Sequence, residues 1–171
     1  MITQKFKKYL SPSAYAQFYR FGLNLWPCIR GGGGKVISIS DDFTQLIVQL
    51  NLGLRTRNLV GTIYGGSMYA STDPMYMLML LEILGPNYVV WDKGCTIRFK
   101  KSATGLIEAK FEITPPMLAD IFENVEKAGE YSFTWKVDYR DKSNQVYCEF
   151  EKVLYVAKKE FYKEKLKRRV Q

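Results

Sequence analysis

The sequence contains no histidine among its 171 residues. Imidazole is the side chain that most often exchanges a proton near neutral pH, so its absence excludes hydrolases of the Ser-His-Asp and Cys-His types. Most histidine-containing metal sites are excluded for the same reason. Any acid or base in a reaction must therefore be Asp, Glu, Lys, Tyr or Cys.

Cysteine and long apolar segments are also scarce. Cys28, Cys95 and Cys148 are widely spaced without a C-x-x-C pair, so neither a disulfide framework nor a zinc site is indicated, and we expect no metal. The N-terminus lacks the apolar segment and cleavage site of a secreted protein. The longest apolar segment, 68–84, is interrupted by two acids and a proline and is too short for a membrane span. We expect a cytoplasmic protein.

The composition suits one domain, 1–171, with a substantial core, because 47% of the residues are hydrophobic. Lys and Arg number 25 against 17 Asp and Glu, a net charge of +8 that favours anionic partners. Much of this excess lies at the two ends, where charge runs are usually solvated faces. No nucleic-acid recognition motif accompanies it, so we do not expect nucleic-acid binding.

Hydrophobic periodicity predicts a helix, two strands, a long apolar helix, two strands, a short helix, two strands and a basic C-terminal helix or tail. The strands are expected at 35–40, 43–51, 88–100, 106–113, 131–140 and 145–157. The flanking helices are expected near 11–26, 115–129 and 158–171. An apolar helix must be covered on nearly all sides, which a curved antiparallel sheet would achieve, so the fold class is α+β.

The segment GGGGK, from Gly31 to Lys35, does not match a phosphate-binding loop. Such a loop would need glycine in place of Ile29 and Ser or Thr in place of Val36, and it would follow a strand. We interpret 31–34 as a flexible linker. On this interpretation 1–34 is an N-terminal helix and linker, and the core occupies about 35–157.

Two interpretations are open for the segment around Asp73. The sequence Ser-Thr-Asp-Pro is a strong helix start, with Asp73 as the cap and Pro74 in the first turn, and local pattern alone favours this interpretation. Alternatively the helix begins at Gly65 and Pro74 is a kink. The amides of Gly65 and Gly66 and the helix dipole would then suit a carbonyl oxygen that gains negative charge.

The stretch NLVGTIYGGSMYASTD, followed by a strand ending in TIRFKKSATG, resembles the hotdog-fold acyl-CoA thioesterases. It is most similar to their domain-of-unknown-function relatives, which share an Asn-x-x-Gly-Thr loop. The resemblance covers about 35–157. It implies a six-stranded antiparallel sheet wrapped around a long central helix, here with extra N- and C-terminal helices. It also implies a homodimer or a dimer of dimers and hydrolysis of acyl-CoA, with no cofactor beyond the CoA of the substrate.

The resemblance assigns roles by position. Asn58 matches a loop amide that helps to hold the thioester, Gly65 and Gly66 match the oxyanion donors, and Asp73 matches the catalytic carboxylate. Asp73 would attack the carbonyl or activate a water, and the sequence does not choose between these. Eight helical residues separate Gly65 from Asp73 by roughly 12 Å, so a site that uses both needs two subunits.

Arg98, Lys100 and Lys101 lie where the family often binds CoA phosphates, at the end of the strand that precedes KSATG. Their alternative interpretation is an exposed strand end kept soluble by charge. Arg55 and Arg57 flank the Asn58 loop and could add to the same site.

Two departures from the family pattern limit what the resemblance implies about activity, although the backbone donor before the two glycines is kept. Tyr64 stands where many relatives have His or Phe, and Met77 stands where relatives often have a hydroxyl residue. The alternative is a non-catalytic module that binds acyl-CoA or a fatty acyl group. A dehydratase is disfavoured because such enzymes usually need a histidine. Neither acyl length nor head group is predicted.

Overall fold

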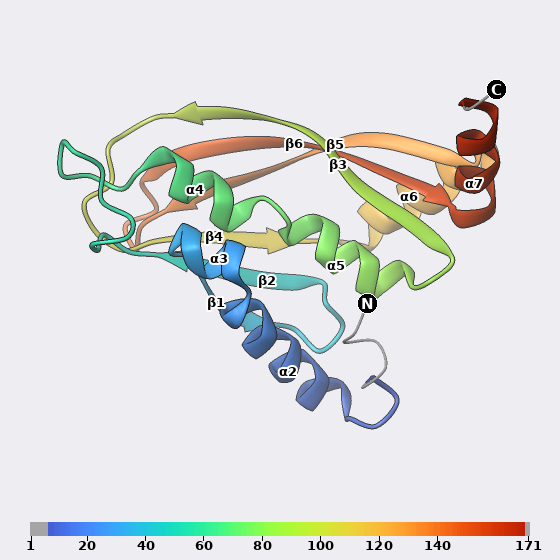
Figure 1. The fold of residues 1–171 in the computed structure, drawn as a ribbon, viewed down its shortest axis with the longest axis horizontal. Helices are drawn as coiled ribbons and strands as arrows, with labels where there is room; N and C mark the ends of the chain where they lie inside the picture. The colour runs from blue at the N-terminus through green and yellow to red at the C-terminus, as the bar shows by residue number, and fades with distance from the viewer. Residues whose placement is uncertain (1–6, 170–171) are drawn as a thin grey trace.

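The computed structural model describes residues 7–169. A six-stranded antiparallel sheet curves around a central pair of helices, and four further helices lie outside it (Figure 1). The strands are Lys35–Ile39 (β1), Gln45–Leu50 (β2), Tyr88–Phe99 (β3), Ile107–Glu112 (β4), Glu130–Arg140 (β5) and Val146–Lys158 (β6). The helices are Pro12–Leu25 (α2), Pro27–Gly32 (α3), Gly65–Thr72 (α4), Met75–Leu84 (α5), Pro115–Ala128 (α6) and Lys159–Arg169 (α7). The predicted order of elements is confirmed, except that α3 was not predicted and the central helix is divided into α4 and α5.

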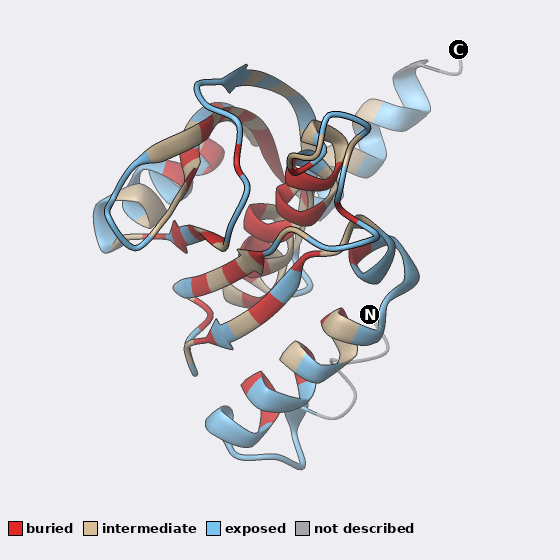
Figure 2. Cartoon of the chain, turned by 90° about the vertical axis from the view of Figure 1, so that its left-hand side faces the viewer, coloured by how far each residue is buried: buried red, intermediate tan, exposed pale blue. Residues whose placement is uncertain are grey.

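The strands follow the order β1-β2-β4-β5-β6-β3 across the sheet, and neighbouring strands pair antiparallel. The long strands β5 and β6 pair over almost their full length, and β6 pairs equally with β3 on its other side. Buried residues line the central helices and the sheet face that packs on them (Figure 2). The β1 and β3 strands form the two edges of the sheet.

The central helix begins at Gly65, so the second interpretation of the Asp73 segment is confirmed and the helix start at Asp73 is wrong. Regular helix stops at Thr72 and resumes at Met75. Asp73 N donates to Tyr69 O (2.9 Å), so Asp73 still closes the last turn of α4. Pro74 cannot donate a backbone hydrogen bond, which explains the break between α4 and α5.

The four glycines at 31–34 are not a flexible linker, and that prediction is wrong. The α3 helix ends at Gly32, and Gly33 caps it in the left-handed conformation (φ 81°), which suits glycine. Gly34 is buried, and a Cβ on it would lie 2.3 Å from Cβ of Ser71 in α4. The glycines therefore allow this segment to pack closely against the central helix.

The N-terminal helix is part of the fold. Ser11 caps α2 by accepting a hydrogen bond from Ala14 N (3.2 Å), as expected from the sequence. The Tyr15 hydroxyl donates to the buried Glu82 carboxylate of α5 (3.1 Å) and so ties α2 to the central helix. Within residues 7–169, no helix is long and apolar enough to cross a membrane.

The methionines of the central helices act mainly as core filler. Met68, Met75 and Met79 are buried in the hydrophobic core, and Met77 is partly buried against it. Flexible, unbranched side chains suit the irregular space between a curved sheet and a bent helix.

Candidate functional site

Four of the seven residues predicted for the site line one hollow at the start of α4. Asn58, Gly65, Lys100 and Lys101 surround a cavity of about 330 Å³, and Phe99 forms part of its wall. The loop before α4 and the end of β3 thus meet at this point. The predicted residues Gly66, Arg98 and Asp73 do not line the hollow.

The first amides of α4 are open. The preceding residue, Tyr64, makes no side-chain cap, and the N–H groups of Gly65 and Gly66 make no hydrogen bond within residues 7–169. A Cβ on Gly65 would lie 2.6 Å from Cζ of Phe99, so the glycine lets this exposed ring approach the helix start. Free amides at a positive helix end suit an anionic oxygen.

Asn58 organises its own loop. Its Nδ2 donates to Thr62 Oγ1 (2.8 Å), and its Oδ1 accepts hydrogen bonds from Thr62 N (2.9 Å) and Val60 N (3.1 Å). Both ends of the amide are therefore occupied within the Asn-x-x-Gly-Thr loop. Contact between Asn58 and a thioester stays a prediction.

The three predicted phosphate contacts differ in their surroundings. Lys100 forms an ion pair with Glu149 (Nζ to Oε2, 3.0 Å), which offsets part of its charge. The Lys101 ammonium lies 5.9 Å from the centre of the Tyr147 ring and makes no ion pair with a described residue. Arg98 is exposed on β3, away from the hollow. Lys101 is therefore the cation best placed to meet an anion there.

Asp73 lies at the break between α4 and α5, and its side chain is 42% exposed. The ammonium of Lys152, in β6, donates to the Asp73 carbonyl (2.7 Å) and to Asp73 Oδ1 (2.9 Å). The Lys152 side chain is only 1% exposed. A buried cation thus fixes both the main chain and the carboxylate of Asp73.

A second carboxylate contacts the same ammonium. Oδ1 of Asp92, on β3, lies 3.4 Å from Lys152 Nζ, and this buried oxygen has no hydrogen-bond partner among the described residues. Burial raises the pKa of the Asp92 carboxyl, and the Lys152 ammonium acts against that increase. One buried lysine is therefore shared between two aspartates.

A β-bulge brings β3 into this cluster. The register between β3 and β6 shifts between Asp92 and Gly94, so one extra residue reverses the alternation of side chains along β3. Asp92 before the bulge and Cys95 after it both face Lys152. Burial raises the pKa of the Cys95 thiol. Bulges are frequent beside active sites because they redirect side chains in this way.

Tyr69, one helical turn before Asp73, completes the cluster. Its pKa is raised to about 12, chiefly by a hydrogen bond to the Asp73 carboxylate and then by burial. The Lys152 ammonium also lies 5.4 Å from the centre of the Tyr69 ring. Sequence reasoning missed Lys152, Asp92 and Tyr69 as members of the site. The signal for Lys152 was a lysine in the apolar alternation of β6.

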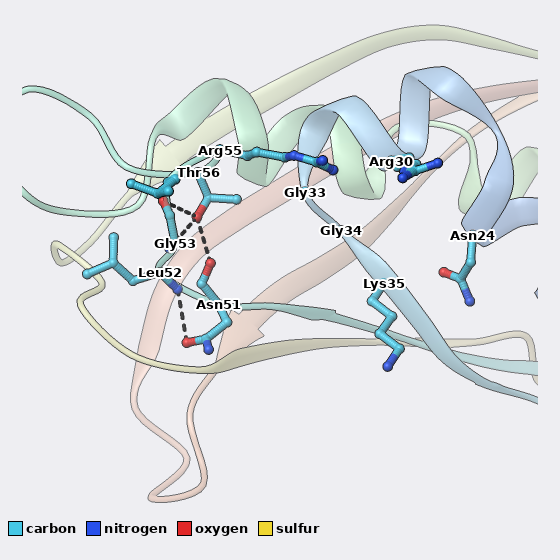
Figure 3. A pocket seen from close by; sticks show the side chains of 11 residues that line it. Asn24, Arg30, Gly33, Gly34, Lys35, Asn51, Leu52, Gly53, Arg55 and Thr56 are labelled. Carbon is cyan, nitrogen blue, oxygen red and sulfur yellow. Dashed lines mark hydrogen bonds between the residues drawn. The ribbon is translucent and has the colours of Figure 1, made fainter.

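A larger hollow lies elsewhere. It has a volume of about 630 Å³ between α3, the start of β1 and the loop at 51–56, with Arg30, Lys35 and Arg55 on its walls (Figure 3). Arg55 therefore faces this hollow rather than the one at Gly65. None of the predicted catalytic residues lines it. Within residues 7–169, no group of three His, Cys, Asp or Glu residues is placed to hold a metal.

Comparisons with known proteins give a family match and a fold. The profile of a family described as "Domain of unknown function (DUF4442)" matches residues 15–156. No curated protein matches the chain.

Three solved structures illustrate the likeness in fold. A protein of unknown function from Pseudomonas aeruginosa, called a probable thioesterase, has a TM-score of 0.73 at 12% identity, with 83% of this chain and 95% of that chain covered. A protein of unknown function from Chlorobaculum tepidum TLS has a TM-score of 0.68 at 15% identity, with 87% and 98% covered. A thioesterase from Haemophilus influenzae has a TM-score of 0.60 at 13% identity, with 87% and 92% covered. The chain has the hotdog fold, as the resemblance implied.

Proposed function

Because the chain belongs to the family described as "Domain of unknown function (DUF4442)" and shares its fold with proteins called thioesterases, we propose that it hydrolyses acyl thioesters such as acyl-CoA. The observation that carries this proposal is the Asp73 carboxylate. It is partly open to solvent and yet is held by a buried ammonium at a break in the central helix. A chain without histidine needs such a fixed carboxylate as its nucleophile or base.

In the proposed reaction, the carbonyl oxygen of the thioester accepts hydrogen bonds from the amides of Gly65 and Gly66. Such a donor is typically worth about 10²–10³ in rate. In one route Asp73 attacks the carbonyl carbon and gives an acyl anhydride, which water then cleaves. In the other route Asp73 takes a proton from a water molecule as that water attacks the carbonyl carbon. In both routes the carbon–sulfur bond breaks and the thiolate takes up a proton. The sum is thioester plus water to carboxylic acid plus thiol.

The proposed site is shared between two protomers. Gly65 and Asp73 are separated by two helical turns, roughly 12 Å, so one chain cannot present both to the same carbonyl. Gly65 and Gly66 of one protomer would face Asp73 of its partner. A two-fold interface then creates two equivalent sites per homodimer, and a dimer of dimers would contain four.

The two edges of the sheet differ in a way that supports dimerisation through β3. At the β1 edge, the Asn24 side chain of α2 donates to Val36 O (2.9 Å) and accepts from Val36 N (2.8 Å), so α2 occupies both backbone groups of Val36. At the other edge, β3 is 12 residues long and, among residues 7–169, pairs with a strand on one side only. The unpaired backbone groups of a long edge strand can form hydrogen bonds with the same strand of a second protomer.

The hollow beside Gly65 would receive the CoA part of the substrate. Lys101, with Lys100 and Arg98 nearby on the same strand end, would meet the phosphates. A cytoplasmic setting, in which acyl-CoA and free thiols coexist, suits the three free cysteines.

The alternative is a module that binds an acyl-CoA without cleaving it. The hollow at Gly65, which is lined without Asp73 of the same chain, would serve either function. Met77, in place of the hydroxyl found in relatives, would leave a water without a second partner.

The first prediction concerns Asp73. We expect Asp73→Asn to lower the release of free thiol from a panel of acyl-CoAs by about 10²–10⁴-fold, because the amide is neither a base nor a nucleophile. Asp41→Asn, the same change at an exposed turn residue, should leave the rate unchanged. Equal rates for the wild type and Asp73→Asn would contradict the proposal. Saturable binding of acyl-CoA without thiol release would establish the binding module instead.

A further inference from the structure

We infer that Lys152 is a positioning residue that orients the Asp73 carboxylate and is shared with Asp92. The catalytic meaning of this inference rests on the proposed thioester hydrolysis. The interaction itself, in which one ammonium contacts two carboxylates, can be measured by NMR without an activity assay.

The location of Lys152 makes a purely structural role costly. In β6 its inward neighbours Phe150 and Leu154 are fully buried apolar residues, and the apolar alternation would continue without a charge. A buried ammonium is tolerated only when it is paired and hydrogen-bonded. The Lys152 ammonium donates hydrogen bonds to Asp73 O and Asp73 Oδ1, and Asp92 Oδ1 lies 3.4 Å from the same nitrogen as an ion-pair partner.

The contacts with Asp73 define its geometry. Lys152 holds the carbonyl at the point where Pro74 breaks the helix, and with the same nitrogen it holds Oδ1. The carboxylate therefore cannot rotate freely about its side-chain bonds, although 42% of the side chain is exposed. Fixed geometry of a reacting group is a large part of enzymatic rate acceleration.

The charges around Asp73 come from three elements. Lys152 faces it from β6, Asp92 and Cys95 face it from β3, and Tyr69 contacts it from its own helix, α4. In general, an ammonium in contact with a carboxylate favours its ionised form, and a second carboxylate nearby opposes that form through like charge. Removing Lys152 and removing the charge of Asp92 should therefore shift the ionisation of Asp73 in opposite directions.

The test follows the Asp73 carboxyl by carbon-13 NMR during a pH titration of the full-length protein, with the wild type, Lys152→Met and Asp92→Asn compared. We expect the pH of half-ionisation to rise by about one pH unit or more in Lys152→Met and to fall in Asp92→Asn. Lys136→Met, which removes an exposed lysine from the neighbouring strand β5, should leave the pH of half-ionisation unchanged.

In thiol-release assays, kcat should fall about 10²-fold in Lys152→Met with little change in KM. The acid limb of the pH–rate profile should move with the NMR midpoint.

Shifts of the same sign in the two variants, or no shift in either, would overturn the inference. If Lys152→Met fails to fold, Asp92→Asn decides alone, since a downward shift supports the shared ammonium and its absence refutes it. If the wild type releases no thiol while the midpoints move as expected, hydrolysis fails and the role of Lys152 stands. If thiol is released and the midpoints do not move, the role of Lys152 fails by itself.

Discussion

At the scale of single residues, the absence of a side chain controls how closely the chain before β1 approaches the central helix. Gly34 lies against Ser71, two residues before Asp73, and its missing Cβ would meet Cβ of Ser71 at 2.3 Å. Gly31, three residues earlier, has nothing within 4 Å of the corresponding position. The two glycines therefore form a matched pair in which only one is required by packing.

We expect Gly34→Ala to reduce the free energy of unfolding by about 1–3 kcal/mol, because the added methyl must displace α4 or the start of β1. Gly31→Ala should be neutral or stabilise by up to about 1 kcal/mol, because alanine favours the α3 helix. Urea denaturation measures both values. Equal effects at the two positions would show that the close contact with Ser71 is not what requires glycine.

Residue-level prediction from the sequence succeeded where a motif fixed local structure and failed where tertiary geometry decided. The start of α2, with Ser11 as its cap, follows from such a motif. For the central helix, local pattern favoured a start at Asp73, whereas the helix begins at Gly65. Lys152 could have been noticed, because it interrupts an apolar alternation in a strand that was predicted correctly. The place of Asp92 could not, because the bulge that turns it toward Lys152 leaves no local signature.

At the scale of elements, the central helix shows why local capping signals can mislead. Ser-Thr-Asp-Pro is a strong start signal, but a longer helix buries Met68 and packs Ser71 against the segment before β1. That tertiary packing outweighs the local preference for a cap at Asp73. The linker prediction failed for a related reason, because glycines that permit close packing have the same composition as glycines that permit flexibility.

The turn of the β1–β2 hairpin gives a pH-dependent prediction. Oδ1 of Asp42 accepts hydrogen bonds from the hydroxyls of Ser40 (2.6 Å) and Thr44 (2.8 Å) and from Thr44 N (3.1 Å). These bonds, led by that from Ser40, lower the pKa of Asp42 from its ordinary value of 3.8. A lowered folded-state pKa means that ionised Asp42 stabilises the fold above the ordinary value. This contribution is lost as the pH falls through the lower folded value.

We therefore expect Asp42→Asn to be less stable than the wild type at pH 7 by less than about 1 kcal/mol, since the turn is exposed and screened. The two proteins should converge in acid, below the folded-state pKa. Urea denaturation at several pH values measures the difference. Asp41→Asn is the control, and a difference that persists undiminished into acid would assign the effect to something other than the charge.

At the scale of the whole molecule, the two edges of the sheet differ in whether their backbone groups have hydrogen-bond partners. At the β1 edge the Asn24 side chain of α2 occupies the backbone groups of Val36, and no strand of the described part of the chain pairs with the outer side of β3. The sequence could predict the sheet and its class from periodicity. The dimer was implied by the resemblance and by the helical separation of Gly65 from Asp73, and it stays a prediction.

The measurement that tests the central claim most directly is complementation between two inactive variants. Asp73→Asn removes the carboxylate. Gly65→Pro removes one amide donor at the first position of α4, where proline is tolerated in a helix. A shared site predicts that the variants, each nearly inactive alone, recover about a quarter of the wild-type thiol release after subunit exchange in equal amounts. This follows because half of the dimers are mixed and each mixed dimer has one intact site of two. Mixed dimers that form but recover no activity would contradict a site built from Gly65 of one protomer and Asp73 of its partner.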